Sequence, residues 1–172
     1  MEQEVAAADD GHLTLRPSIF ARKTTGSYYT PEELVRLILR RAIGPLLAER
    51  RQAFAGRAAA LAGDRRPKSE RLRLLSECDP AEAFVRLRVC DPAMGSGHFL
   101  VSLVDYLGDE VLTAIGDAPT LVAWADEAEP YRSPLVTRIE NLRAEIRRSA
   151  DENNWSVPDD QLDDRHLVRR II

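Results

Sequence analysis

In Phe84-Val-Arg-Leu-Arg-Val-Cys-Asp-Pro-Ala-Met-Gly-Ser-Gly-His-Phe-Leu-Val-Ser-Leu-Val-Asp-Tyr-Leu107, three local patterns follow one another without a gap. Residues 84–90 alternate apolar and basic side chains over the length of a β-strand. Residues 91–97 form a glycine-containing turn, and residues 98–107 are mostly apolar, as in a helix that packs on a core. Strand, tight turn and helix in this order predict the opening of a βαβ unit, and therefore an α/β fold.

A second motif, Gly26-Ser-Tyr-Tyr-Thr-Pro31, predicts where a helix begins. Thr30 suits the N-cap, the proline after it suits the first helical position, and Glu33 completes a capping box. Apolar residues then recur at helical spacing over residues 34–43. We expect this helix to stop or kink at Gly44-Pro45, because proline lacks an amide proton and clashes with the preceding turn.

The rest of the chain is predicted to be mainly helical, so that the whole contains one or two strands. The expected elements are a short edge strand at 12–16, a helix at about 46–61, a break at 63–67, short helices near 69–76 and 80–84, a proline-containing connection at 118–133, and helices at 135–150 and 159–172. A parallel strand needs hydrogen-bonded neighbours, and residues 84–90 provide only one convincing strand for such a sheet. We therefore expect the chain to be the N-terminal piece of a longer domain.

Composition narrows the class of protein. The chain has 172 residues, of which 44% are hydrophobic and 30% charged, and its mean hydropathy is −0.31. No apolar stretch approaches the roughly 18–20 residues that cross a bilayer, and the acidic N-terminus does not resemble a secretion signal. We expect a cytoplasmic globular protein with no membrane contact. Cys78 and Cys90 are too few for a metal site or a disulfide framework, and we expect both to be buried, reduced thiols.

Charge is divided unevenly along the chain. Residues 12–88 contain sixteen basic and eight acidic side chains, whereas residues 89–172 contain eight basic and sixteen acidic ones. Such asymmetry can mark a surface that faces nucleic acid. The simpler interpretation, which we favour, is that basic helices pack beside acidic ones or beside sequence that this chain lacks.

The glycine turn has features of a cofactor loop. Leu100 stands where a dinucleotide fingerprint has its third glycine, and the turn lacks the Lys and Ser/Thr of a phosphate-binding P-loop. Gly95 and Gly97 allow a ligand to approach the backbone closely. The amides at the start of the following helix can accept a carboxylate, and Asp91 supplies an anion beside them. S-adenosyl-L-methionine, which carries an ammonium, a carboxylate and a sulfonium, meets these demands.

Together, the two motifs resemble a known family. Gly26-Ser-Tyr-Tyr-Thr-Pro31, followed about sixty residues later by Val89-Cys-Asp-Pro-Ala-Met-Gly-Ser-Gly-His-Phe99, resembles the adenine-specific, amino-methylating DNA methyltransferases. The likeness is greatest to the large single-chain restriction-modification and BREX-type phage-exclusion enzymes, and it covers residues 22–116. It implies the start of a Rossmann-like class I methyltransferase domain, with S-adenosyl-L-methionine as cofactor and double-stranded DNA as partner.

The resemblance also implies roles for single residues. Those implied to bind the cofactor are Tyr29, Thr30, Asp91, Ala93, Gly95, Ser96 and Gly97. Tyr29 and Thr30 would line the pocket as a lid, although Thr30 also suits a simple helix cap and Asp91 a plain turn carboxylate. Phe99 would pack the loop on the sheet, and His98 occupies a variable position. Tyr28 would either stack on adenine or pack at the helix entry.

The family's catalytic motif is missing from this sequence. That motif, Asn/Asp-Pro-Pro-Tyr/Phe, holds the adenine that is flipped out of the duplex, and no Pro-Pro pair occurs in the chain. The acidic residue that holds the cofactor ribose has no counterpart either. The expected organisation is a lead-in at 1–21, a helical region with the lid at 22–88, and a truncated methyltransferase domain at 89–172. We therefore expect a chain that is inactive alone and that contacts DNA through parts it lacks.

Two other functions remain open from the sequence. One is a small helical protein that binds nucleic acid or regulates a partner, for which the basic segment 12–88 is the support. Such a protein would bind DNA with a strong salt dependence and would ignore the cofactor. The other is a cofactor-binding domain that acts on RNA or on a small molecule.

Overall fold

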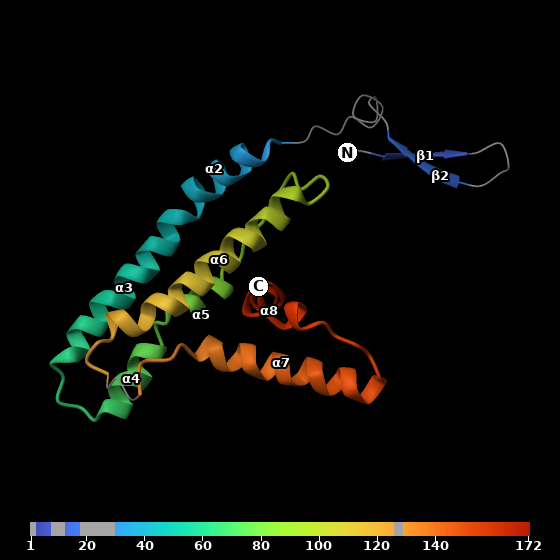
Figure 1. Ribbon diagram of the computed structural model, residues 1–172. Coiled ribbons are helices and arrows are strands. Elements are labelled where there is room, and N and C mark those ends of the chain that lie inside the picture. The colour runs from blue at the N-terminus through green and yellow to red at the C-terminus, as the bar shows by residue number, and fades with distance from the viewer. Residues whose placement is uncertain (1–2, 8–12, 18–29, 126–128) are drawn as a thin grey trace. The chain divides into compact units, whose positions relative to one another are not determined.

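The computed structural model describes residues 3–7, 13–17, 30–125 and 129–172. They belong to two compact units, Met1–Leu34 and Val35–Ile172 (Figure 1). The first unit contains an antiparallel hairpin of β1 (Gln3–Ala7) and β2 (Leu13–Pro17), in which Gln3 lies opposite Pro17 and Ala7 opposite Leu13. The strand predicted at 12–16 overlaps β2.

Two consecutive helices open the second unit. Helix α2 (Glu32–Ala42) begins two residues after Thr30 and buries Val35 and Leu39. Helix α3 (Gly44–Ala62) follows at once, with a proline in its first turn. The predicted break at Gly44-Pro45 is confirmed, since Ile43 separates the two helices as the N-cap of α3, and so is the helix predicted at 46–61.

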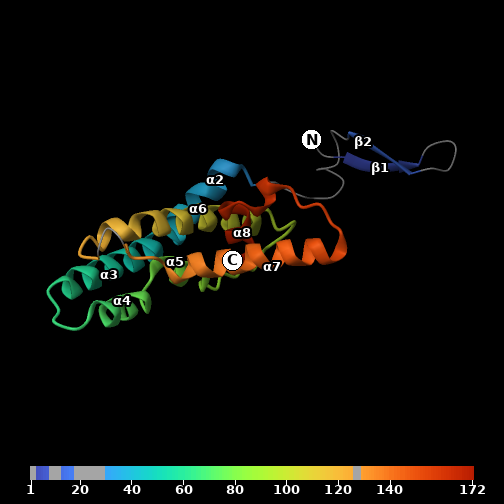
Figure 2. The same ribbon diagram turned by 60° about the horizontal axis from the view of Figure 1, so that its bottom comes forward.

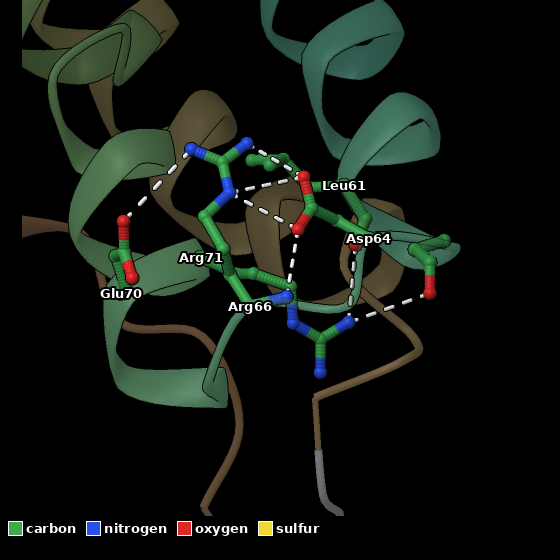
Figure 3. A network of polar contacts seen from close by, with 6 residues as sticks. Leu61, Asp64, Arg66, Glu70 and Arg71 are labelled. Atoms are coloured by element: carbon green, nitrogen blue, oxygen red, sulfur yellow. Dashed lines mark hydrogen bonds and ion pairs between the residues drawn. The ribbon is translucent and has the colours of Figure 1, made fainter.

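The corner after α3 is held by polar contacts (Figure 3). The backbone N–H of Arg66 donates to the carboxylate of Asp64 at 2.8 Å, and its guanidinium donates to the same group. These bonds lower the pKa of Asp64 to about 2. Arg71, on helix α4 (Lys68–Ser76), donates to the carbonyl of Leu61 at 3.0 Å. The carbonyls at the end of α3, which have no partner inside the helix, thereby gain a donor.

The strand predicted at 84–90 is wrong. Helix α5 (Pro80–Val85) occupies the first part of this segment, with Asp79 as its N-cap and proline in its first turn. Phe84 is fully buried in the helical core, so its place in the apolar alternation reflects helix packing. Residues 87–90 have no regular structure. An extended segment becomes a strand only when a neighbour pairs with its backbone groups, and these residues pair with no strand among the described ones.

Consequently the predicted α/β fold, the Rossmann-like start of a methyltransferase domain, is wrong for this chain. From Thr30 onward, the described residues form helices and connecting segments, without a strand. Helix α6 (His98–Leu121) continues well past the predicted residue 107. Figures 1 and 2 show it running alongside α3, and Arg51 joins the two helices by an ion pair to Glu110 at 2.8 Å.

The C-terminal helices pack on α5 and α6. Helix α7 (Pro134–Asn153) begins at the N-cap Ser133, and a short 3₁₀ helix, η1 (Asp159–Leu162), leads into α8 (Asp164–Ile171). Arg165 and Arg169 of α8 form ion pairs with Asp109 and Asp105 of α6, each at 2.8 Å. No helix among the described residues is long and apolar enough to cross a membrane.

Two groups of buried side chains form the core of this unit. The larger group joins α2, α5, α6, α7 and α8 through Val35, Phe84, Val111, Leu135 and Leu167, each almost inaccessible to solvent. The smaller group lies at the other end of α3 and α6 and contains Phe54, Leu61, Leu75, Val122 and Tyr131. Packing between helices therefore replaces the sheet that the sequence had led us to expect.

Candidate functional site

The candidate site is the loop at residues 91–97, which connects the irregular segment 87–90 to α6. Its first turn is closed by Asp91, whose side chain accepts a hydrogen bond from the backbone N–H of Ala93 at 2.9 Å. This is an Asx turn, in which a carboxylate fixes the backbone two residues on. The second carboxylate oxygen of Asp91 has no partner among the described residues, so it can accept from a ligand.

Both glycines of the loop adopt conformations that favour glycine. Gly95 has φ 57° and Gly97 has φ 79°, in the left-handed region where a Cβ atom costs energy. A Cβ atom added to Gly97 would meet nothing within 4 Å. Glycine is therefore required at residue 97 by the backbone conformation and not by crowding, and the space beside it is open to a ligand.

The loop ends at the N-terminus of a long helix. Gly97 is the N-cap of α6 and provides no side-chain cap, while its carbonyl accepts from Val101 N–H at 3.0 Å. The amides of Phe99 and Leu100 precede this first helical bond and have no acceptor inside the helix. No acidic residue lies in the first turn. This arrangement provides amide donors and the positive end of the helix dipole to an anion.

The loop is largely exposed to solvent. Ala93, Gly95 and Ser96 are exposed, and the side chain of Met94 is 52% exposed. Residues 91–99 line none of three pockets that other described residues form. A ligand held here would therefore need walls supplied from elsewhere.

The structure does not test whether the predicted lid contacts this loop. Tyr28 and Tyr29 lie outside the described residues, while Thr30 is exposed in the first unit. The roles assigned to Tyr29 and Thr30 stay predictions. Phe99 is partly buried against the larger core group, so it packs on helices and not on a sheet.

The two cysteines have different surroundings. Cys78 is half-buried, burial raises the pKa of its thiol, and its Sγ donates to the carbonyl of Leu75 at 3.2 Å. Cys90 is exposed beside the loop, so the prediction that it is buried is wrong. Among the described residues, no three His, Cys, Asp or Glu side chains gather as a metal site.

A second polar cluster was not predicted from the sequence. The buried carboxylate of Asp79 accepts hydrogen bonds from Glu82 N–H at 3.0 Å, Ser133 Oγ at 2.9 Å and Tyr131 OH at 2.8 Å. Burial, followed by the charge of Asp79, raises the pKa of Tyr131, so the phenol remains a donor. Asp79-Pro80 is a recognisable helix start, but no local pattern indicates partners more than fifty residues away.

The charge division is partly explained by ion pairs. Arg51–Glu110 and Lys68–Glu129 join the basic segment to the acidic one. Six exposed arginines between residues 36 and 88 have no acidic partner among the described residues: Arg40, Arg41, Arg50, Arg57, Arg65 and Arg88.

Comparison of the chain with protein families, curated proteins and solved structures gave no match.

Proposed function

We propose that the loop at residues 91–97 binds the methionine part of S-adenosyl-L-methionine, as a component of an adenine-specific DNA methyltransferase of restriction-modification or phage-defence type. The observation that carries the proposal is the pair of left-handed glycines, Gly95 and Gly97, leading directly into an uncapped helix N-terminus.

Each polar group of the cofactor has a counterpart in this loop. The carboxylate would accept hydrogen bonds from the amides that begin α6. The ammonium would lie against the unused oxygen of Asp91, while Ala93 and Ser96 would contribute backbone contacts.

The methyl-transfer step itself needs residues that this sequence does not contain. An enzyme that methylates adenine N6 in a duplex must hold the base in a pocket after flipping it out. The motif that forms such a pocket has adjacent prolines, and this chain has none. The chain would therefore supply the methionine half of the cofactor site, and DNA would be bound by other parts of the enzyme.

Cofactor binding can be tested residue by residue. Titrating S-adenosyl-L-methionine into ¹⁵N-labelled protein should shift the amide resonances of Gly95 and Gly97, and Asp91→Ala should abolish the shifts. Asp117→Ala, which removes an exposed acid from helix α6 far from the loop in the sequence, is the matched control. Affinity should be lower than that of a complete site by roughly tenfold or more, since each missing ribose contact is worth about 1–3 kcal/mol. Unshifted glycine resonances at millimolar cofactor would refute the proposal.

The alternative function, binding of nucleic acid by this chain itself, is favoured by the six arginines without acidic partners. Exposed arginines bind phosphates and release condensed counterions, so affinity falls steeply with salt. Fluorescence anisotropy of a labelled DNA duplex at 50 and 200 mM salt tests this. Strong binding at 50 mM that is lost at 200 mM, without any response to the cofactor, would favour the alternative.

A further inference from the structure

A pocket of about 410 Å³ lies at the C-terminal half of α7, bounded by the turn after this helix, η1 and α8. Its apolar floor includes Leu142, Ile146 and Val157, and Trp155 forms part of its wall. The volume falls in the range of small-molecule sites, about 300–1,000 Å³. None of its residues belongs to the loop at residues 91–97, so a ligand in this pocket is independent of the cofactor proposal.

Trp155 is held in place by its backbone while its side chain remains accessible. Asn154 adopts φ 54° and ends α7, and the N–H of Trp155 donates to the carbonyl of Ala150 at 2.9 Å. This is the geometry of a Schellman turn, which fixes the residue after the left-handed one. The Trp155 side chain is nevertheless 66% exposed, the highest value among the exposed large apolar residues described. An aromatic ring on a fixed backbone is therefore presented to solvent at the pocket.

The polar side chains of this pocket are uncommitted. The carboxylate of Glu145, the hydroxyl of Ser149, the amide of Gln161 and the guanidinium of Arg170 have no partner among the described residues. Glu145 and Arg170 carry opposite charges and both line the pocket, but they do not pair with each other. The pocket thus presents one anion, one cation and two neutral hydrogen-bonding groups.

The other two pockets differ in this respect, because most of their polar side chains already have a hydrogen-bond or ion-pair partner. The bonds concerned are Glu77–Arg73, Glu82–Arg86, Glu82–Arg138 and the Asp79 cluster in one pocket, and Arg132–Glu140, Glu129–Lys68 and Tyr131–Asp79 in the other. Their polar groups hold the helices together. Only the α7–α8 pocket, of these three, keeps a balanced set of charges for a ligand.

We propose that the α7–α8 pocket binds a nucleotide with an amino-bearing base, either free or as a unit of a single strand. The base stacks on Trp155 above the apolar floor, since aromatic side chains stack on any base. Glu145 accepts a hydrogen bond from the exocyclic amine. Arg170 binds the phosphate, for which a guanidinium is the preferred partner.

The test uses the two tryptophans of the chain, Trp124 and Trp155. Adding AMP should quench the fluorescence of the wild-type protein, and Trp155→Phe should remove this response. Arg170→Gln should weaken AMP binding about tenfold in calorimetry, whereas Arg148→Gln, an exposed arginine of α7 that does not line the pocket, should not change it. Adenosine, which has no phosphate, should bind both arginine variants as it binds the wild type.

A second binding experiment, which compares AMP with an oligonucleotide, decides whether the nucleotide is free or part of a strand. A short single-stranded oligodeoxyadenylate that binds more tightly than AMP assigns the pocket to a nucleic-acid strand, and the reverse order assigns it to a free nucleotide. Unchanged Trp155 fluorescence at millimolar AMP and oligonucleotide, or equal losses for the two arginine variants, would overturn the proposal. Saturation-transfer NMR on the wild-type protein detects AMP binding directly and does not depend on whether a variant folds.

Discussion

Two carboxylates twelve residues apart, Asp79 and Asp91, have contrasting surroundings. Asp79 is 2% exposed and accepts hydrogen bonds from three groups on two segments of the chain. Asp91 lies at the surface and accepts a single bond, from the backbone two residues away. Asp79 therefore holds the helices together, whereas Asp91 shapes one turn and keeps an oxygen for a ligand. The position of each aspartate before a helix does not distinguish these two roles. They are distinguished by how many hydrogen-bond donors reach each carboxylate and by how far away in the sequence those donors lie.

The largest expected effect separates the two carboxylates directly. Asp79→Ala should lower the free energy of unfolding by about 3 kcal/mol or more, because three buried donors lose their acceptor at about 1–3 kcal/mol each. Asp91→Ala should change it by less than about 0.5 kcal/mol, as surface substitutions usually do. Urea unfolding followed by circular dichroism measures both values. If both variants lost a similar free energy of unfolding, the two carboxylates would not differ in their structural role.

The donors of the Asp79 cluster provide the next test. Tyr131→Phe should cost about 1.5–3 kcal/mol, the usual value of a hydrogen bond to a charged group. In the Asp79→Ala background the same change should cost much less, since the phenol has already lost its acceptor. The double-mutant cycle from urea unfolding gives this coupling. Additive effects would show that the hydroxyl of Tyr131 contributes independently of Asp79, because phenylalanine keeps the ring that packs against Phe54 at a centroid distance of 5.4 Å.

Two glycines extend the comparison to the backbone. Gly97→Ala should destabilise the protein by roughly 1–2 kcal/mol, because its φ of 79° is left-handed. Gly56→Ala should stabilise it by about 0.5–1 kcal/mol, because Gly56 lies inside α3 and an added Cβ meets nothing within 4 Å. Thermal unfolding compares the two. If Gly97→Ala were neutral, the loop would not hold its left-handed conformation.

The smallest effect concerns Asp64, a partly exposed carboxylate whose two oxygens both accept hydrogen bonds from Arg66. Its pKa of about 2 lies below the ordinary value, so its contribution to stability is present above about pH 4 and is lost as the pH falls through about 2. Carbon-detected NMR of the side chain should show this titration. In the Arg66→Gln variant the midpoint should return toward 3.8, while an unchanged midpoint would contradict the assigned cause.

Local signals in the sequence predicted most of the helices. The break at Gly44-Pro45 and the helix starts near Pro80 and Pro134 follow from the chemistry of proline and of capping side chains. The strand at 84–90 was wrong because alternation over a few residues also arises where a helix ends and an exposed segment follows. Phe84 is buried by its helix and Val89 is 42% exposed, so the same pattern has two unrelated causes.

The sites were predictable to different extents. The left-handed conformations of Gly95 and Gly97 could be predicted, because glycine is the usual residue where a tight turn needs a positive φ. The partners of Asp79 and the pocket beside Trp155 depend on how α5, α7 and α8 pack, and no local pattern encodes such packing. Asn154 could have indicated a helix end, but not that the next side chain would stand beside a cavity.

The hydrogen bonds from Tyr131 and Ser133 to Asp79 close a loop of the chain that contains the whole of α6. The entropic cost of such a closure rises only with the logarithm of loop length, so the length of α6 adds little to it. The segment that begins α7 is thereby joined to the start of α5, and the docking of α7 depends in part on one buried carboxylate.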